Sequence, residues 1–163
     1  MTLTFRLAQP RDLSAIMAIE RAGFTPAEAA SPASMAARIA RYPDTFITAW
    51  QSDVLVGYGV GPAIAQPHLT DDLFETAQAN PPAAAYIAVL SLAVAPSARR
   101  QGVGTALLAA LTNAAQRQHR RGITLTCLAR LVPFYQRNGF ASAGRSASTH
   151  AGEQWFDMVK MLQ

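Results

Sequence analysis

The feature that most constrains this chain is a short stretch rich in arginine and glycine, Arg99-Arg100-Gln101-Gly102-Val103-Gly104-Thr105. It follows an apolar run typical of a strand, residues 88–94, and precedes a run with helical spacing, residues 103–111. Glycines let a backbone approach a ligand without an intervening Cβ, and a helix N-terminus presents unpaired N–H groups with a partial positive charge. Arginines add bidentate donors. The stretch therefore predicts an anion site, most simply for phosphate.

The composition indicates one globular domain, which we expect to span residues 1–163. Half of the 163 residues are hydrophobic and 15% are charged, which supplies a packed core and argues against disorder. No apolar run has membrane-spanning length, and the first residues lack the pattern of a signal peptide. The single cysteine, Cys127, excludes an internal disulfide framework and is expected to be a buried, inert thiol. We expect a cytoplasmic protein without membrane contact.

The charge is unevenly distributed along the chain. Residues 1–84 hold five arginines and eight acids, whereas residues 85–163 hold eight arginines, one lysine and two acids. Such an asymmetry can indicate nucleic-acid binding, but the arginines are scattered and no basic run or aromatic platform accompanies them. A small polyanionic ligand in the C-terminal half explains the bias with fewer assumptions, so we expect no nucleic-acid partner.

Hydrophobic periodicity predicts a mixed α+β chain around one sheet. Residues 59–85 contain Gly-Pro and Pro-Pro breakers and are expected to form a flap, because neither flanking half looks self-sufficient. Strands are expected at residues 4–7, 46–50, 54–58, 86–94, 123–127, 141–149 and 154–162, and helices at residues 12–22, after Pro32, at residues 103–119 and at residues 131–138.

The glycine stretch does not match the common nucleotide-binding motifs. No Gly-x-x-x-x-Gly-Lys-Ser/Thr pattern and no nearby lysine support an ATP-binding P-loop. No Gly-x-Gly-x-x-Gly follows the first strand, which argues against a dinucleotide fold. One alternative remains at this point, in which Gly102 and Gly104 only permit tight packing between strand and helix.

A second segment favours a ligand over packing. The sequence of residues 92–108, around the glycines, resembles the acetyl-CoA loop of the GNAT acetyltransferase superfamily, and Val132-Pro133-Phe134-Tyr135-Gln136-Arg137-Asn138-Gly139-Phe140 resembles its "FY-x-x-x-GF" segment. The resemblance covers most of the chain. It implies a single-domain GNAT fold with a central, mixed, largely antiparallel sheet of about seven strands, a splayed central strand pair and flanking helices.

Other segments are similar to one branch of that superfamily, the serotonin or arylalkylamine N-acetyltransferases. The similar segments are Leu131-Val132-Pro133-Phe134-Tyr135, the run Phe24-Thr25-Pro26-Ala27-Glu28-Ala29-Ala30-Ser31, Arg41-Tyr42-Pro43-Asp44 and Trp155-Phe156-Asp157-Met158. Cys127-Leu128-Ala129-Arg130 also lacks the asparagine that most superfamily members carry there. This resemblance implies a small arylalkylamine as acceptor.

The resemblance implies direct acetyl transfer from acetyl-CoA to a primary amine, with no metal. Tyr135 matches the general acid that protonates the departing CoA thiolate, although a phenol packed beside Phe134 is the alternative. Backbone N–H near Leu92 would polarise the thioester carbonyl. The residues expected to bind acetyl-CoA are Leu92, Ala93, Val94, Arg99, Arg100, Gln101, Gly102, Val103, Gly104 and Thr105.

The general base is not evident from the sequence. Matching on Leu92-Ala93-Val94 puts Ala88 and Leu90 where vertebrate serotonin acetyltransferases carry two histidines. Glu20, His68 and His150 are candidates, but we expect each to be a solvated surface residue.

The acceptor wall is expected to include Phe24, Pro26 and Trp155, with ordinary core packing as the equal alternative. Two other functions stay open, acetylation of protein or peptide amines and a CoA-binding regulatory module without turnover. We expect a monomer or a homodimer.

Overall fold

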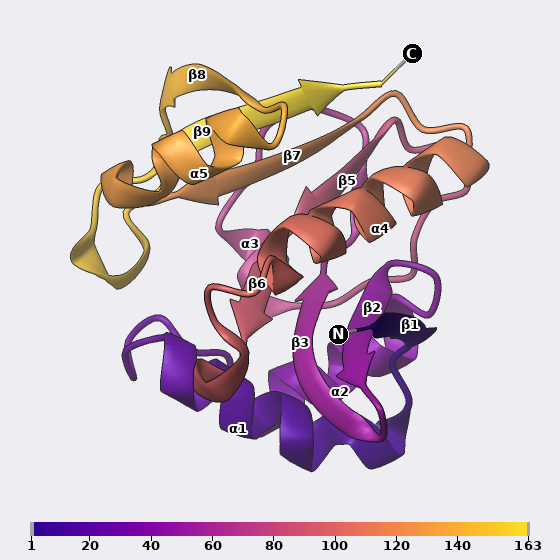
Figure 1. Cartoon of the computed structure of the whole chain (residues 1–163). Helices are drawn as coiled ribbons and strands as arrows, with labels where there is room; N and C mark the ends of the chain where they lie inside the picture. Colours follow the sequence, from indigo (N-terminus) through magenta and orange to yellow (C-terminus); the bar gives the residue numbers. More distant parts are fainter. Residues whose placement is uncertain (1, 163) are drawn as a thin grey trace.

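The computed structural model describes residues 2–162 of the chain. Within them nine strands form two sheets, and helices pack on their faces (Figure 1). The strands are β1 (Leu3–Leu7), β2 (Phe46–Gln51), β3 (Val54–Val60), β4 (Ala63–Ile64), β5 (Tyr86–Val89), β6 (Ser91–Val94), β7 (Gly122–Cys127), β8 (Ala141–Arg145) and β9 (Phe156–Met161). The helices are α1 (Leu13–Gly23), α2 (Pro32–Arg41), α3 (Asp72–Glu75), α4 (Val103–Arg117) and α5 (Val132–Arg137), with short 3-10 turns at Pro10–Asp12, Pro96–Ala98, Ala129–Leu131 and His150–Gly152.

The expected α+β fold is confirmed, but its sheet is divided. One sheet has the order β1-β2-β3-β6 and the other the order β4-β5-β7-β9-β8. All strand pairs are antiparallel except β5 with β7. The count exceeds the expected seven strands because residues 86–94 form two strands and the flap adds β4.

The division occurs at Leu90, which belongs to neither strand. Before it, β5 pairs with β7 up to the partners Val89 and Leu125. After it, β6 pairs with no strand other than β3 among residues 2–162, from Ser91 opposite Val60 to Val94 opposite Gly57. The continuous strand expected at residues 86–94 was therefore wrong: the chain changes partner at Leu90. This change opens a fork between β6 and the end of β7.

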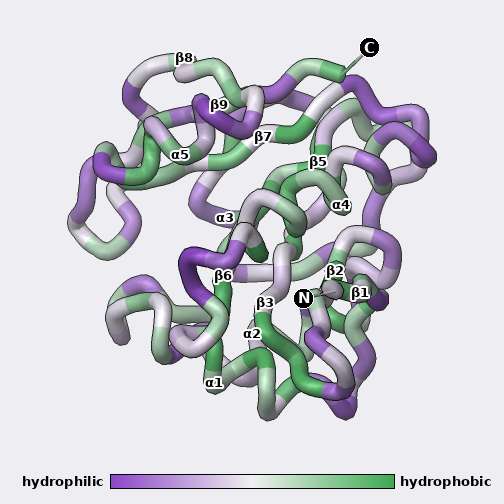
Figure 2. Tube along the Cα trace, viewed as in Figure 1, coloured by the Kyte–Doolittle hydropathy of each residue, from purple (hydrophilic) through white to green (hydrophobic). Residues whose placement is uncertain are grey.

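Two hydrophobic clusters hold the fold. α4 packs across β2, β3, β6 and β7 and buries Leu107, Leu108 and Leu111 almost completely. α1 and α2 pack on the opposite face of the first sheet, where Ile16, Met35 and other apolar residues meet β3. Figure 2 shows hydrophobic stretches along α1, β3 and parts of α4. The fork therefore opens between elements that are firmly packed on both sides.

Residues 61–84 cover the second sheet as the expected flap. Thr124 on β7 donates a hydrogen bond of 2.6 Å to the carbonyl of Pro67. Asn80 accepts one from the Ala63 N–H at 2.8 Å and donates one to Thr45 at 2.9 Å. These bonds fasten the flap to the sheet although it contains little regular structure.

Candidate functional site

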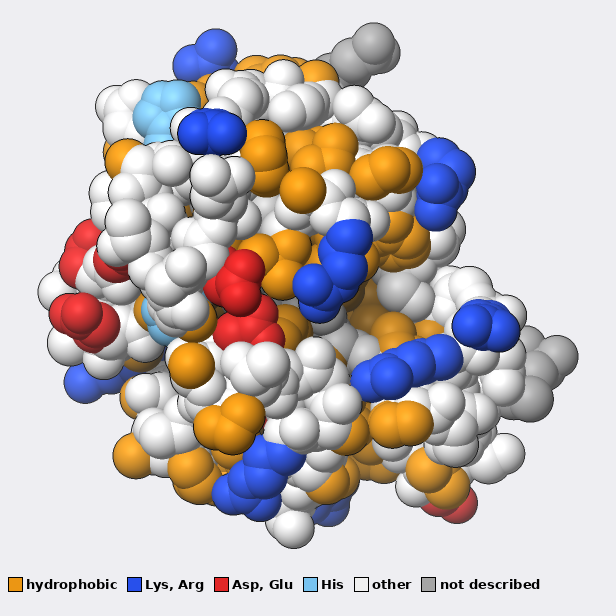
Figure 3. Space-filling view, turned by 90° about the vertical axis from the view of Figure 1, so that its left-hand side faces the viewer, with side chains coloured by type: hydrophobic (Ala, Val, Ile, Leu, Met, Phe, Trp, Pro, Cys, Tyr) orange, Lys and Arg blue, Asp and Glu red, His pale blue; other side chains and the backbone are white. Residues whose placement is uncertain are grey.

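The fork between β6 and β7 leads into a cavity of about 570 Å³. Its wall comes from segments far apart in the sequence: the end of α1 and the loop after it, α2, the flap helix α3, β6, the end of β7, α5 and the loop before β9. On the face drawn in Figure 3, hydrophobic side chains line a hollow bordered by Lys or Arg side chains. A cavity that joins an open strand edge to an apolar interior can hold a ligand with both a polar and an apolar part.

The glycine stretch forms the turn into α4 at the end of β6. Gly102 has a φ of +79° as the residue that caps α4, and Arg100 has a φ of +63°. The first hydrogen bond of α4 joins the Ala106 N–H to the Gly102 carbonyl at 3.0 Å. The N–H groups of residues 103–105 therefore have no partner within the helix and point out of its N-terminus. This geometry suits an anion.

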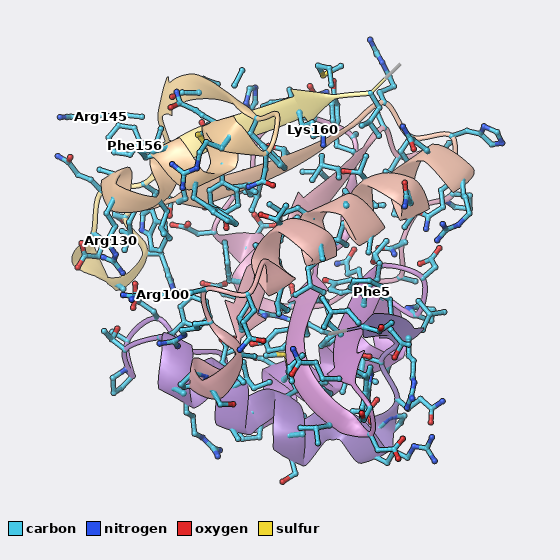
Figure 4. The ribbon with its side chains drawn as sticks, in the orientation of Figure 1. Phe5, Arg100, Arg130, Arg145, Phe156 and Lys160 are labelled. Carbon is cyan, nitrogen blue, oxygen red and sulfur yellow. The ribbon has the colours of Figure 1, made fainter. Side chains whose placement is uncertain are left out.

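Two arginines line the cavity, and one of them belongs to the glycine stretch. Arg99 lines the cavity and reaches the Val94 carbonyl with Nε at 3.3 Å and the Ala22 carbonyl with Nη2 at 3.5 Å. Arg130, in the turn after β7, also lines the cavity. Arg100 and Arg130 lie on the same side of the molecule (Figure 4). These cations lie where an anionic ligand could extend from the fork toward α4.

The structure brings half of the predicted site residues together in the cavity wall. Pro26, Arg100 and residues 101–105 are not part of the cavity wall, and Val103 has its side chain in the core with 2% exposure. A contribution of Val103 to binding would therefore come from its backbone. The predicted residues that line the cavity are Phe24, Leu92, Ala93, Val94, Arg99, Tyr135 and Trp155.

Tyr135 lies on α5 at the end of the cavity next to β7. It packs edge-on against Phe134 and Phe140, with ring centroids 5.1 and 5.7 Å away. Burial, and to a lesser degree the neighbouring Cys127 thiol, raise the pKa of Tyr135 well above its usual value of 10.0. The phenol therefore stays protonated and can donate a proton or a hydrogen bond into the cavity.

Cys127 lies at the end of β7 and also lines the cavity. It is buried, as expected, and burial raises its pKa from 9.0 to about 11. Because the thiolate is the nucleophilic form, this thiol is inert near neutral pH.

Glu20 is not the solvated residue that the sequence suggested. It is 1% exposed, lies on α1 facing β3 and β6, and lines the cavity. Tyr58 donates a hydrogen bond to Oε1, Ser91 donates a second at 3.3 Å, and the Ala30 N–H donates to Oε2 at 2.8 Å. Three donors satisfy the oxygens of this carboxyl group, so its burial is compensated.

Arg38 on α2 is the second buried charge at this cavity. It is 4% exposed and lines the wall, yet its Nη1 has no hydrogen-bond partner among residues 2–162. Burial lowers the pKa of Arg38, and the attraction of Glu20 opposes that effect. Arginine remains charged in proteins, so the cavity carries a buried cation beside a buried anion.

Sequence reasoning missed Arg38 and misjudged Glu20, although both interrupt an apolar helix face. Glu20 follows Ile16 by four positions and Met17 by three, and Arg38 follows Met35 by three. Side chains at these spacings share one face of a helix. A charge on the apolar face of an amphipathic helix is the signal that could have identified both.

Besides Tyr135, four rings line the cavity: Phe24 from the loop after α1, Phe74 from α3, and His150 and Trp155 from the loop before β9. His150 stacks on Phe74 at 5.3 Å and lies 6.0 Å from Trp155, whose indole N–H donates to the His150 carbonyl at 2.9 Å. His150 is therefore half-buried in the cavity wall, contrary to the expected solvated position. These contacts tie the flap to the C-terminal loop and make one wall of the cavity aromatic.

The remaining candidates for a base lie elsewhere. His68 is exposed, as expected, and is not part of the cavity wall. Ala88 is fully buried, whereas Leu90 lines the cavity.

Within the described chain, no group of three His, Cys, Asp or Glu side chains could hold a metal ion. No helix among residues 2–162 is both long and apolar enough to cross a membrane.

The fold is similar to several solved structures. Ard1 from Thermoplasma volcanium superposes with a TM-score of 0.80 at 18% identity, covering 100% of this chain and 99% of that one. The GNAT-like decarboxylase GphF, in complex with isobutyryl-CoA, gives 0.85 at 19%, covering 98% and 100%. The ribosomal-protein-S18-alanine N-acetyltransferase from Escherichia coli gives 0.73 at 18%, covering 99% and 95%. Likeness at such low identity establishes the fold alone.

Sequence comparison, unlike the structural likeness, identifies the family of the chain. No curated protein matches the chain significantly. The sequence profile of the family described as "Acetyltransferase (GNAT) domain" matches residues 17–162, which include both the glycine stretch and the segment around Tyr135.

Proposed function

The chain belongs to the GNAT acetyltransferase family, and from this premise we propose that it transfers the acetyl group of acetyl-CoA directly to a small primary amine. The observation that carries the proposal is the position of β6 in the fork. The open edge of β6 connects the turn before α4 with the cavity that Tyr135 lines. One extended donor can therefore span the anion site and the reaction centre.

The donor-binding residues follow from that connection. The pyrophosphate would accept hydrogen bonds from the N–H groups of residues 103–105, with Arg99 and Arg130 nearby. The pantetheine arm would lie along the edge of β6 that pairs with no strand among residues 2–162. The thioester would then come next to Leu92 at the cavity, where a backbone N–H can polarise its carbonyl.

The chemistry needs one bond formed, one broken and three proton transfers. The amine nitrogen attacks the thioester carbon, the C–N bond forms, and the C–S bond breaks. The thiolate takes a proton from the Tyr135 hydroxyl, whose raised pKa keeps it protonated. The bound ammonium first loses one proton, for which Glu20 and His150 in the cavity wall are the candidate acceptors. The second proton, released by the nitrogen as the C–N bond forms, restores the Tyr135 hydroxyl.

Glu20 is the better supported of the two proton acceptors. It accepts from Ser91, the residue that precedes Leu92 on β6, so its carboxylate lies close to the expected position of the thioester. His150 belongs to the aromatic wall and its ring is stacked on Phe74. We assign Glu20 to hold the ammonium form of the acceptor and to pass its proton to solvent.

The cavity wall favours a small acceptor with an apolar tail. Phe24, Phe74 and Trp155 present apolar surface around the acceptor side. This supports the arylalkylamine acceptor that the sequence suggested, although the family assignment itself extends only to the superfamily. A peptide acceptor would need an open groove, and here the flap and the loop before β9 meet through the contact between Phe74 and His150.

The experiment is an amine screen with release of free thiol from acetyl-CoA as readout. Tryptamine, phenethylamine, polyamines and peptides with free N-termini form the panel. Turnover with the small amines supports the proposal, and turnover confined to peptides overturns the acceptor class. Binding of CoA by calorimetry without thiol release on any amine would support the regulatory module instead.

A further inference from the structure

We propose that the acceptor of this protein carries a carboxylate as well as its primary amine, and that Arg38 binds that carboxylate. This inference rests on the proposed function and narrows its substrate class. It points to α-amino acids or similar zwitterions with an apolar side chain, in preference to simple amines.

The first observation is the state of Arg38 itself. Arg38 contributes to the cavity wall, the residue is 4% exposed, and its Nη1 has no hydrogen-bond partner among residues 2–162. A buried polar group without a partner is costly, and a buried charge more so. A carboxylate is the group that matches the planar donor fork of arginine. A bound carboxylate would therefore give the Arg38 guanidinium a hydrogen-bond partner that residues 2–162 do not provide for Nη1.

The second observation is that the Glu20 carboxyl group is not a hydrogen-bond partner of Arg38 Nη1. Its carboxylate oxygens accept from Tyr58, Ser91 and the Ala30 N–H, so its hydrogen bonds go to β3, β6 and the loop after α1. Glu20 attracts Arg38 through space, and Nη1 stays unpartnered within residues 2–162. The two charges are therefore separate binding groups in one cavity.

The third observation is the order of the groups along the cavity. Glu20 contacts Ser91 at the start of β6, next to the expected thioester position, whereas Arg38 lies on α2 beside the flap helix α3. An acceptor whose ammonium lies at Glu20 can thus extend its acidic group toward Arg38. Its side chain would meet the aromatic wall of Phe24, Phe74 and Trp155. A single small zwitterion could therefore contact Glu20, Arg38 and the aromatic wall.

The test compares acceptors that differ only in the carboxylate: tryptophan with tryptamine, phenylalanine with phenethylamine, and leucine with isopentylamine. Thiol release from acetyl-CoA gives kcat and KM for each. We expect kcat/KM to be about 10- to 100-fold higher for the carboxylated member of at least one pair, the range set by a hydrogen bond to a charged group. Equal or better turnover of all three simple amines would overturn the inference and leave the proposed function standing.

Variants of Arg38 separate carboxylate binding from a structural role. Arg38→Gln is expected to raise KM for the preferred amino acid about 10- to 100-fold and to leave KM for its decarboxylated partner within about twofold. Arg38→Lys should retain part of the preference, because it keeps the charge without the fork. Arg41→Gln, an exposed arginine on the same helix, should change neither value. An equal rise for both members of a pair would mean that Arg38 only supports the fold, and would overturn the inference.

Binding provides a readout that does not depend on turnover. Calorimetric titration of the CoA-loaded protein with tryptophan and with tryptamine tests the same preference if no thiol is released. Tighter binding of tryptophan, lost in Arg38→Gln, supports carboxylate recognition even when the proposed transfer fails. Tighter or equal binding of tryptamine, and of the simple amine in the other two pairs, contradicts it.

Discussion

Gly104, in the first turn of α4, lies directly against the ring of Phe134, because a Cβ on Gly104 would come within 3.3 Å of Cζ of that ring. Phe134 in turn packs edge-on against Tyr135. The two sequence motifs, which lie about thirty residues apart, are therefore in contact in the structure. The position of Tyr135, the proposed general acid, therefore depends on the absence of a side chain at Gly104 in the first turn of α4.

The first prediction concerns this contact. Gly104→Val should displace Phe134 and with it Tyr135, because overpacking of a close contact costs about 1 to 3 kcal/mol. We expect a lower Tm, weaker CoA binding by calorimetry and a several-fold lower kcat. Ala109→Val, on an exposed position of the same helix, controls for the β-branched residue. If both variants behave alike, the contact does not position Tyr135.

The second prediction concerns Gly102. Its φ of +79° is unfavourable for a residue with a Cβ, although a Cβ there would meet no atom within 4 Å. Gly102→Ala should therefore destabilise the fold by about 1 to 2 kcal/mol through the backbone alone, and it should weaken CoA binding by shifting the N–H groups that follow.

Gly144 provides the matched control for that variant. It has a φ of +92°, a Cβ added there would likewise meet no atom within 4 Å, and it lies on β8 away from the anion site. Gly144→Ala should lower the free energy of unfolding similarly, measured by urea denaturation, and leave CoA affinity unchanged. Equal loss of CoA affinity in both variants would contradict a specific role for the turn at Gly102.

The sequence was sufficient to predict those parts of the site that depend on local backbone chemistry. Gly102 and Gly104 before a helical run predict a turn with free N–H groups, and the expected roles of Phe24, Trp155 and Tyr135 became specific predictions through the family resemblance. The elements flanking them were expected within a few residues of where they lie, since their apolar spacing is regular.

The parts that escaped prediction depend on contacts between distant elements. Leu90 breaks a strand because its neighbours pair with β3 on one side and β7 on the other, and no local signal in residues 86–94 marks this change. The burial of Glu20 requires Tyr58 and Ser91, which are distant in sequence. The position of Arg38 in the same cavity requires α1 and α2 to cover one face of the sheet. Tertiary packing, not propensity, determines each of these features.

The third prediction tests the general acid. Tyr135→Phe removes the proton donor but keeps the ring packed between Phe134 and Phe140. We expect kcat to fall about 100-fold or more, the usual contribution of general acid catalysis, with little change in CoA affinity. Tyr86→Phe, a buried tyrosine of β5 outside the cavity wall, should keep full turnover. Unchanged kcat at saturating substrates in Tyr135→Phe would exclude the role.

The fourth prediction concerns stability at high pH. Burial raises the pKa of Cys127 from 9.0 to about 11, so the unfolded chain releases this proton at a lower pH than the folded chain does. The contribution to stability is complete below pH 9 and is lost as the pH rises from 9 to about 11. Tyr58 and Tyr135, whose pKa values are also raised mainly by burial, add to the loss above pH 10.

Urea unfolding at pH 8, 9, 10 and 10.5 measures that dependence. The free energy of unfolding should fall by about 1 to 2 kcal/mol over this range from Cys127 alone, and Cys127→Ala should flatten the part of the curve between pH 9 and 10. A thiol that reacts with iodoacetamide at pH 8 as fast as a free cysteine would contradict the burial argument.

The last prediction concerns Glu20, whose structural role can be separated by one substitution from its proposed role in binding the acceptor. Glu20→Gln keeps a carbonyl oxygen for the Ala30 N–H and a similar volume beside Tyr58, so the loop after α1 should remain in place. The charge that would hold an ammonium group is lost. We therefore expect KM for amines to rise about 10-fold or more and kcat/KM to fall, whereas CoA affinity stays unchanged and Tm changes little. Glu153→Gln, an exposed residue outside the cavity wall, is the control. If Glu20→Gln weakens CoA binding as much as amine binding, the carboxylate serves the fold of α1 against β6 and does not recognise the acceptor.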